Sequence, residues 1–182
     1  MRTSRAQQIE DAIASRQLMR IERRFEDAPI LGHVLAAGPR FFLVAVVSDQ
    51  LWYDGFECFR IADVRAIAPD RYGGFAEAAL KLRGERTPRR PRVDLASTRA
   101  LLDSAGARYP LVTIHREMIE PDICRIGRVV STTASRVTLL QIAPDARWDA
   151  TPIAYPLSGI TRVDFGGDYE DALWLVGAPA PA

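Results

Sequence analysis

The feature that most constrains the fold of this chain is an internal repeat, because each copy of a repeat must form a unit that buries its own apolar residues. Displacing the 182-residue sequence by 93 positions, and by 95 or 96 in its middle part, superposes apolar residues, glycines and tryptophans in the same order. The matched pairs include Ile9 with Leu102, Leu18 with Leu111, Gly32 with Gly127, Leu43 with Leu139, Trp52 with Trp148, and Gly84 with Gly177. We therefore predict a tandem duplication. The alternative is two unrelated β segments that share generic patterning.

Each copy begins with a predicted amphipathic helix. Residues 4–16 and 95–106 carry apolar side chains at helical spacing among polar ones, so the apolar stripe of each helix must pack on another element. In the second copy Asp94 or Ser97 is the expected N-cap, and Gly106 marks the expected end of the helix.

Five short strands follow each predicted helix. Apolar runs and alternations separated by turn residues indicate strands over residues 18–25, 30–36, 40–47, 56–61 and 64–68, and again over 111–118, 125–131, 136–142, 153–157 and 160–165. A short closing helix is expected over 75–83 and 168–176, after the Gly-Gly pair of each copy. Short, closely connected strands hide their edges by curling. The predicted fold class is therefore mostly β with short helices, arranged as two tandem helix-plus-five-strand small barrels.

The segment over residues 54–64, DGFECFRIADV, looks like the fourth and fifth strands of bacterial proteins of the Sm-like or SH3-like small-barrel superfamily. The chain resembles that superfamily over nearly all of both copies, and the resemblance implies ring assembly and RNA binding. Two features of Sm-type RNA recognition have no counterpart. The turns at 36–40 and 131–135 lack the uridine-contacting Asn, and the joints at 62–63 and 158–159 lack the Arg-Gly of the second Sm motif.

The predicted organisation is a first repeat over 1–84, a basic, proline-containing linker over 85–93, a second repeat over 94–177 and a disordered tail over 178–182. The stretch over 81–92, KLRGERTPRRPR, holds six basic residues and one acid. Its prolines favour an extended, solvated linker, and its arginines also suit phosphate contacts. The candidate nucleic-acid residues are Arg86, Arg89, Arg90 and Arg92.

Three aromatic residues are candidates for protein interaction. Phe41 begins the run 41–47, which is apolar on both faces of its strand and so must be covered on both, by the helix, by the other repeat or by a second chain. Trp52 and Trp148 fall at matched positions of the repeat. Such a tryptophan lines a peptide groove or plugs the mouth of the barrel.

Composition narrows the function classes. The chain has 24 basic and 23 acidic residues, so no global field draws it to nucleic acid or anionic lipid. Cys58 and Cys124, with His33 and His115, lack the spacing of a metal site. No catalytic residue, metal ligand or phosphate loop is indicated. Without a signal peptide or a long apolar run, we expect a soluble, cytoplasmic protein with reduced thiols.

These observations favour a non-enzymatic interaction module that binds a protein partner, or itself as a homo-oligomer, through small-barrel surfaces. The alternative is an RNA-binding Sm-like protein that uses the arginine-rich segment between the repeats. Neither a membrane nor a small-molecule cofactor is expected as a partner.

Overall fold

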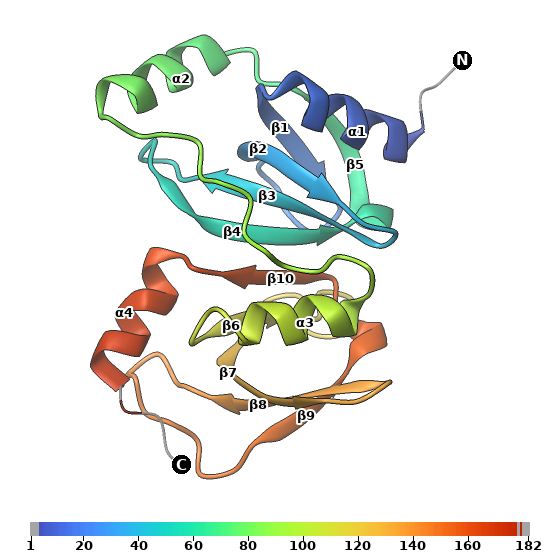
Figure 1. Ribbon diagram of the computed structural model, residues 1–182, viewed down its shortest axis with the longest axis vertical. Helices are drawn as coiled ribbons and strands as arrows, with labels where there is room; N and C mark the ends of the chain where they lie inside the picture. The colour runs from blue at the N-terminus through green and yellow to red at the C-terminus, as the bar shows by residue number, and fades with distance from the viewer. Residues whose placement is uncertain (1–3, 178, 180–182) are drawn as a thin grey trace. The chain divides into compact units, whose positions relative to one another are not determined.

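The computed structural model describes residues 4–177 and residue 179, and the chain divides into two compact units between Pro91 and Arg92 (Figure 1). The predicted disordered tail over 178–182 lies outside the described residues, apart from residue 179. Both units are mostly β, and each has five antiparallel strands with a helix before and a helix after them.

The first unit begins with a helix whose capping follows from its sequence. Ser4 lies in extended backbone just before the helix, and its hydroxyl accepts a hydrogen bond from the Gln7 backbone N–H at 3.2 Å. The strands pair antiparallel in the order β5-β1-β2-β3-β4. The elements are α1 (Arg5–Ser15), β1 (Leu18–Arg23), β2 (Ile30–Ala37), β3 (Phe41–Val47), β4 (Tyr53–Arg60), the 3-10 turn η1 (Ile61–Asp63), β5 (Val64–Pro69) and α2 (Gly73–Leu82).

The second unit follows the same plan. Ser97, not Asp94, caps its first helix by accepting a hydrogen bond from the Ala100 backbone N–H at 3.0 Å, and the helix ends at Gly106 as predicted. The strand order is β10-β6-β7-β8-β9, which matches that of the first unit. The elements are α3 (Thr98–Gly106), β6 (Val112–His115), β7 (Cys124–Thr132), β8 (Arg136–Gln141), β9 (Ile153–Pro156), the 3-10 turn η2 (Leu157–Gly159), β10 (Arg162–Phe165) and α4 (Asp168–Gly177). Each predicted helix and strand thus has a counterpart, including both closing helices. The strand predicted over 111–118 is shorter than expected and spans only Val112–His115, because the Ile119 and Glu120 backbone N–H groups donate to the Arg116 carbonyl oxygen and turn the chain.

The predicted closure into barrels is wrong. In the first unit β4 and β5 are the two ends of the strand order, and no ladder joins them among the described residues. The reason is the connection between them: η1 is a single 3-10 turn that sends β5 to the far side of β1 instead of along β4. The second unit has the same open order.

The turn after the third strand corrects the predicted match of the two tryptophans. A left-handed residue closes this turn in both units, Leu51 at φ 60° and Ala146 at φ 60°. The next pair across the ladder is Val47 with Tyr53 in the first unit and Ile142 with Trp148 in the second. Trp148 therefore occupies the place of Tyr53 and not that of Trp52.

The third strands are also one residue out of the predicted alignment. A bulge in the second strand, between Val34 and Ala36 or between Val129 and Ser131, marks the same place in each unit. Before it, Val34 pairs with Val44 and Val129 pairs with Leu139. Leu139 thus corresponds to Val44. The second unit has one residue more than the first between the turn and the fourth strand, and the sequence match had placed this insertion before the third strand.

An arginine at the same place in each unit lies over an aromatic ring of the fourth strand. The Arg23 guanidinium lies 4.5 Å from the ring centre of Phe59, and the Arg116 guanidinium lies 5.3 Å from that of Tyr155. Arg23 is 1% exposed, and it forms an ion pair with Glu26. Arg23 is the last residue of β1 and Arg116 directly follows β6, while both rings belong to the fourth strand of their unit, so the contact spans equivalent positions of the two units.

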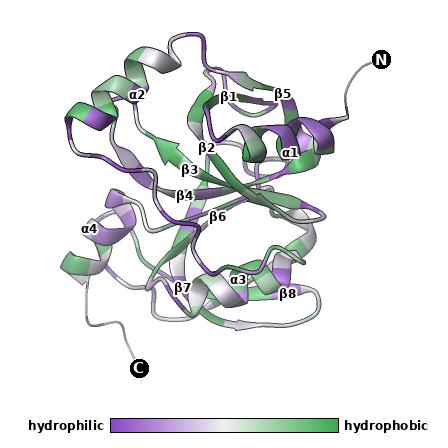
Figure 2. Cartoon of the chain, turned by 45° about the horizontal axis from the view of Figure 1, so that its top comes forward, coloured by the Kyte–Doolittle hydropathy of each residue, from purple (hydrophilic) through white to green (hydrophobic). Residues whose placement is uncertain are grey.

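The third strand of the first unit is buried along both faces. Residues 41–45 are each 0–1% exposed, and β3 is hydrophobic along its length in Figure 2. On one face Phe42 and Val44 pack in a cluster with Ile9 and Ala12 of α1. The helix is therefore one of the covers that a strand apolar on both faces requires.

Close approach of the second strand to the third depends on glycine. A Cβ at Gly127 would meet the carbonyl oxygen of Leu140, and would lie 2.9 Å from its carbonyl carbon. Gly32 is crowded in the same way by the Ala45 carbonyl oxygen, at 2.7 Å. Because these neighbours are backbone atoms, the strands must separate to admit a side chain.

We predict that Gly127→Ala lowers the free energy of unfolding by about 2–3 kcal/mol, as overpacking against backbone does. Gly74→Ala is the matched control, since a Cβ there meets nothing within 4 Å and alanine favours the helix by up to about 1 kcal/mol. Urea unfolding followed by circular dichroism measures both changes. Equal midpoints for the two variants would contradict the close approach.

Candidate functional site

The four candidate arginines of the linker face solvent. Arg86, Arg89, Arg90 and Arg92 are exposed, and residues 85–95 form neither helix nor strand. None of the four guanidinium groups has an ion pair or a hydrogen bond within the described part of the chain. Their charge is available to a ligand, while RNA binding by them stays a prediction.

A side-chain network fixes the start of this segment to the first unit. The hydroxyl of Tyr53 lies 3.0 Å from Oγ1 of Thr87 and 3.2 Å from Nδ1 of His33. His33 is 6% exposed, and burial lowers its pKa, with Glu77 acting in the opposite direction. Thr87 is therefore anchored on the β2 and β4 side of the unit, which places the neighbouring arginines at a defined position and not on a free tether.

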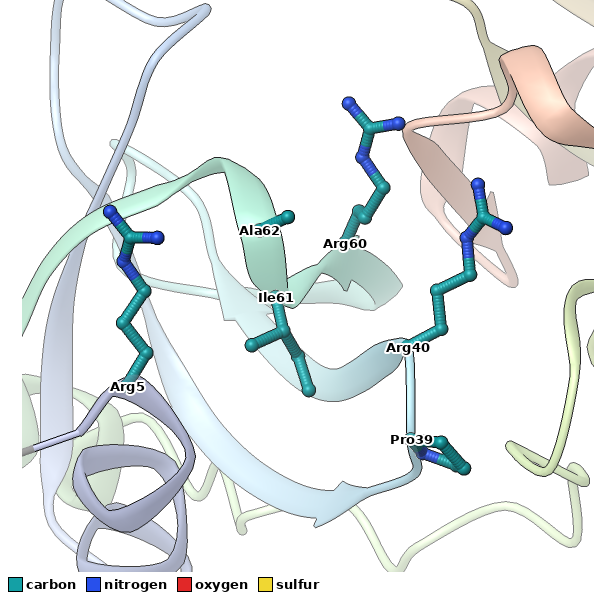
Figure 3. A pocket seen from close by; sticks show the side chains of 6 residues that line it. All are labelled: Arg5, Pro39, Arg40, Arg60, Ile61 and Ala62. Carbon is teal, nitrogen blue, oxygen red and sulfur yellow. The ribbon is translucent and has the colours of Figure 1, made fainter.

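A hollow of about 600 Å³ opens where the β2–β3 turn meets the end of β4 (Figure 3). The backbone N–H of Ile61 donates to the Arg40 carbonyl oxygen at 2.9 Å and joins the turn to the 3-10 segment. Arg5 comes from the first turn of α1. We call this site the arginine hollow. Its lining residues are Arg5, Pro39, Arg40, Arg60, Ile61 and Ala62.

The arginine hollow combines one fixed and two exposed guanidinium groups. Arg60 makes a two-pronged ion pair with Asp63, Nε to Oδ2 at 2.5 Å and Nη2 to Oδ1 at 2.9 Å. Arg5 and Arg40 are exposed, and in Figure 3 Arg40 and Arg60 extend in the same direction. Planar guanidinium groups around an apolar floor suit a phosphate or another anion.

The corresponding place in the second unit has no arginine. There the Leu157 backbone N–H donates to the Ser135 carbonyl oxygen at 2.9 Å, which is the same contact between turn and 3-10 segment. Ser135 stands where Arg40 does, and Pro156 stands where Arg60 does. The arginines at these two positions are therefore particular to the first unit.

The three candidate interaction residues lie in different surroundings. Trp148 is half-buried; its Nε1–H donates to the Gly177 carbonyl oxygen at 2.6 Å and its ring meets Trp174 edge-on, so it holds the end of α4. Trp52 is 43% exposed, with the Arg83 guanidinium 4.7 Å from its ring centre. Phe41 is 1% exposed. Of the three, Trp52 offers the most surface to a partner.

The structure brings together a cysteine and a histidine that sequence spacing did not connect. His115 of β6 lies directly opposite Cys124 of β7 and opposite Arg162 of β10. Its Nε2 lies 2.8 Å from Oδ2 of Asp164. The sequence could have indicated this pair if β6 and β7 had been recognised as neighbouring strands of one hairpin. The last residue of β6 and the first residue of β7 then face each other across the hairpin.

The electrostatics of this cluster do not activate the thiol. Burial raises the pKa of Cys124, and the Asp164 charge raises it further, so the group stays a neutral thiol near pH 7. Burial alone would raise the pKa of Asp164, but Arg162 and His115 outweigh it and hold that pKa at about 2. An ionised Asp164 orients the imidazole. No set of three or more described side chains is arranged to hold a metal ion.

The closing helices expose large apolar side chains. We call these surfaces the α2 face and the α4 face. Sequence reasoning predicted the helices but not the exposure. On α2 and its N-cap the exposed residues are Tyr72 (70%), Phe75 (72%) and Leu82 (88%), and on α4 they are Tyr169 (53%), Leu175 (79%) and Val176 (75%). Within the described residues, no helix has the length and apolar character needed to span a membrane.

We predict that Asp164→Asn lowers the free energy of unfolding at pH 7 by about 2 kcal/mol, because a pKa held near 2 against an ordinary 3.8 stabilises the folded state. A carboxyl group whose pKa is lowered by folding stabilises the folded state at pH values above its ordinary pKa of 3.8. This contribution therefore disappears as the pH falls from about 4 towards 2. Urea unfolding over that range should show a steeper decline for the wild type than for the variant. The control is Asp145→Asn, at an exposed surface pair. Parallel wild-type and Asp164→Asn profiles would contradict the assignment.

Comparisons with known proteins find no relative of this chain. No family model matches the chain, and neither a curated protein nor a solved structure matches it. Its function is therefore argued from the surfaces described above: the arginine hollow, the linker arginines, and the α2 and α4 faces.

Proposed function

We propose that this chain is a non-enzymatic interaction module that associates with a second copy of itself through the α2 and α4 faces. The observation that carries the proposal is the exposure of six large apolar side chains, five on two short helices and one, Tyr72, at the N-cap of α2. Soluble monomers rarely expose large apolar patches, and apolar side chains gathered on one helix mark interaction sites.

The pattern of α2 shows why its outer face needs a cover. Gly73, Ala76 and Leu80 are buried against the first unit, where Ala76 and Leu80 pack with Leu18 and Val47. Phe75 and Leu82 are seven residues apart, which places them on one side of the helix and away from the buried side. A helix that is apolar on more than one side is normally covered on more than one side.

The two units support the further proposal that the chain is a tandem duplication of one Sm-like or SH3-like unit. They share the strand order, the bulge in the second strand, the left-handed turn and the contact between arginine and aromatic ring. The resemblance to that superfamily implies assembly of copies, which agrees with self-association.

We predict that the wild-type chain forms a reversible oligomer and that Phe75→Gln or Leu175→Gln weakens it about 10- to 100-fold, as loss of a central apolar side chain does. Sedimentation velocity over a concentration series measures the association. Val130→Gln is the matched control, because Val130 is an exposed apolar residue (47%) on β7 and not on either helix. A wild-type chain that stays monomeric would refute the proposal.

A second candidate function is binding of single-stranded RNA through its phosphates. The observation that favours it is positive charge without a paired acid: the four linker arginines are exposed and lack ion pairs within the described residues. The arginine hollow presents a further exposed guanidinium group, that of Arg5. None of the four linker arginines is followed or preceded by an aromatic residue that would stack on bases. Such binding would be weak and governed by salt.

We predict that a fluorescently labelled RNA oligonucleotide binds with an affinity that falls steeply with salt, at a logarithmic slope of about −3 for four phosphate contacts. Replacing Arg86, Arg89, Arg90 and Arg92 with alanine should flatten that slope, and replacing Arg5 and Arg40 tests the hollow separately. Arg147→Ala, an exposed arginine of the second unit, is the control. Anisotropy that is unchanged in the fourfold variant would exclude the linker.

A further inference from the structure

We infer that the two faces pair with each other between molecules: the α2 face of one copy packs on the α4 face of a second copy. This inference rests on the proposed self-association and adds to it which surface meets which. The alternative is homotypic pairing, in which each face packs on the same face of the second copy. The apolar side chains do not separate the two arrangements, because both faces combine aromatic and aliphatic side chains: Tyr72, Phe75 and Leu82 on the α2 face, and Tyr169, Leu175 and Val176 on the α4 face. The charges at the borders of the two faces distinguish unlike pairing from homotypic pairing.

The α2 face has a basic border. Arg71 precedes the helix and is exposed, and Arg83 caps its end. Arg83 donates to the carbonyl oxygens of Gln50 and Leu51 and lies over the Trp52 ring, so no carboxylate neutralises it among these contacts. The acid of the helix, Glu77, accepts a hydrogen bond from the Leu18 backbone N–H and is thereby directed towards β1.

The α4 face has an acidic border. The first turn of α4 contains Asp168, Glu170 and Asp171, and the helix has no basic residue. Glu170 accepts a hydrogen bond from the Thr113 hydroxyl at 2.5 Å and is thereby directed towards β6, so the border is formed by Asp168 and Asp171. Asp171 lies four residues before Leu175, and Asp168 lies seven residues before it, so both acids fall on the side of the helix that exposes Leu175. Figure 2 shows the change along α4 from hydrophilic at its start to hydrophobic at its end.

Charge therefore selects the pairing of unlike faces. Packing α2 on α2 would bring the arginine borders of two molecules together, and packing α4 on α4 would do the same for the acids. Packing α2 on α4 places basic beside acidic borders around an apolar centre. Like charges across an interface are unfavourable and opposite charges favourable, so the borders provide specificity that the apolar residues lack.

A complementation experiment separates the two arrangements. One full-length variant carries Phe75→Gln and Leu82→Gln, and a second carries Leu175→Gln and Val176→Gln. Each is analysed alone and mixed with the other by sedimentation velocity, with one variant fluorescently labelled, and circular dichroism confirms that both stay folded. Val130→Gln in each background is the control for an exposed apolar residue outside the two faces.

If α2 pairs with α4, each variant alone is monomeric, because it lacks one of the two required faces. The mixture forms a heterodimer through the remaining intact pair, and added salt weakens it. If either variant alone retains wild-type association, or if the mixture gains nothing over the separate variants, unlike pairing is refuted while self-association stands. If the wild type itself does not associate, the proposed function fails first.

Discussion

The burial of β3 on both faces is the requirement on which the first unit depends. Phe41–Val47 contains no polar side chain, so the strand cannot lie at a surface. Pairing with β2 and β4 satisfies its backbone, and α1 covers the face that carries Phe42 and Val44. The close approach of β2 is possible because Gly32 has no side chain where the Ala45 carbonyl lies. The helix, the strand order and the glycine position are three consequences of one apolar strand.

The second unit keeps this frame and changes its chemistry. Its third strand has Thr138 and Gln141 where the first unit has Leu43 and Val46, so its requirement for cover is smaller. The polar residues of the two units gather at different places: the first unit has the arginine hollow, and the second has an imidazole and a carboxylate across β6 and β10. Apolar residues maintain the common frame, while residues that do not contribute to the core are free to differ.

The closing helices connect this frame to the proposed association. Each buries one side on its own sheet, Leu80 in one unit and Leu173 in the other, and each leaves a second apolar side in water. An isolated chain gains nothing from those outer side chains. A second copy would remove them from water, and the opposite charges at the borders of the two faces would fix the pairing.

The sequence alone determined the elements and their order, because capping residues such as Ser4 and Ser97, apolar periodicity and turn residues act over a few neighbouring positions. It also predicted an extended, solvated segment around the linker arginines, because a stretch rich in arginine and proline has few apolar residues to bury. It misplaced Trp148 by one residue, since strand register depends on pairing across the sheet and not on local pattern. Only the tertiary structure decided that the sheets stay open, that His115 meets Cys124, and that Phe75 and Leu175 face water. These are contacts between residues distant along the chain, and their geometry is set by the whole fold.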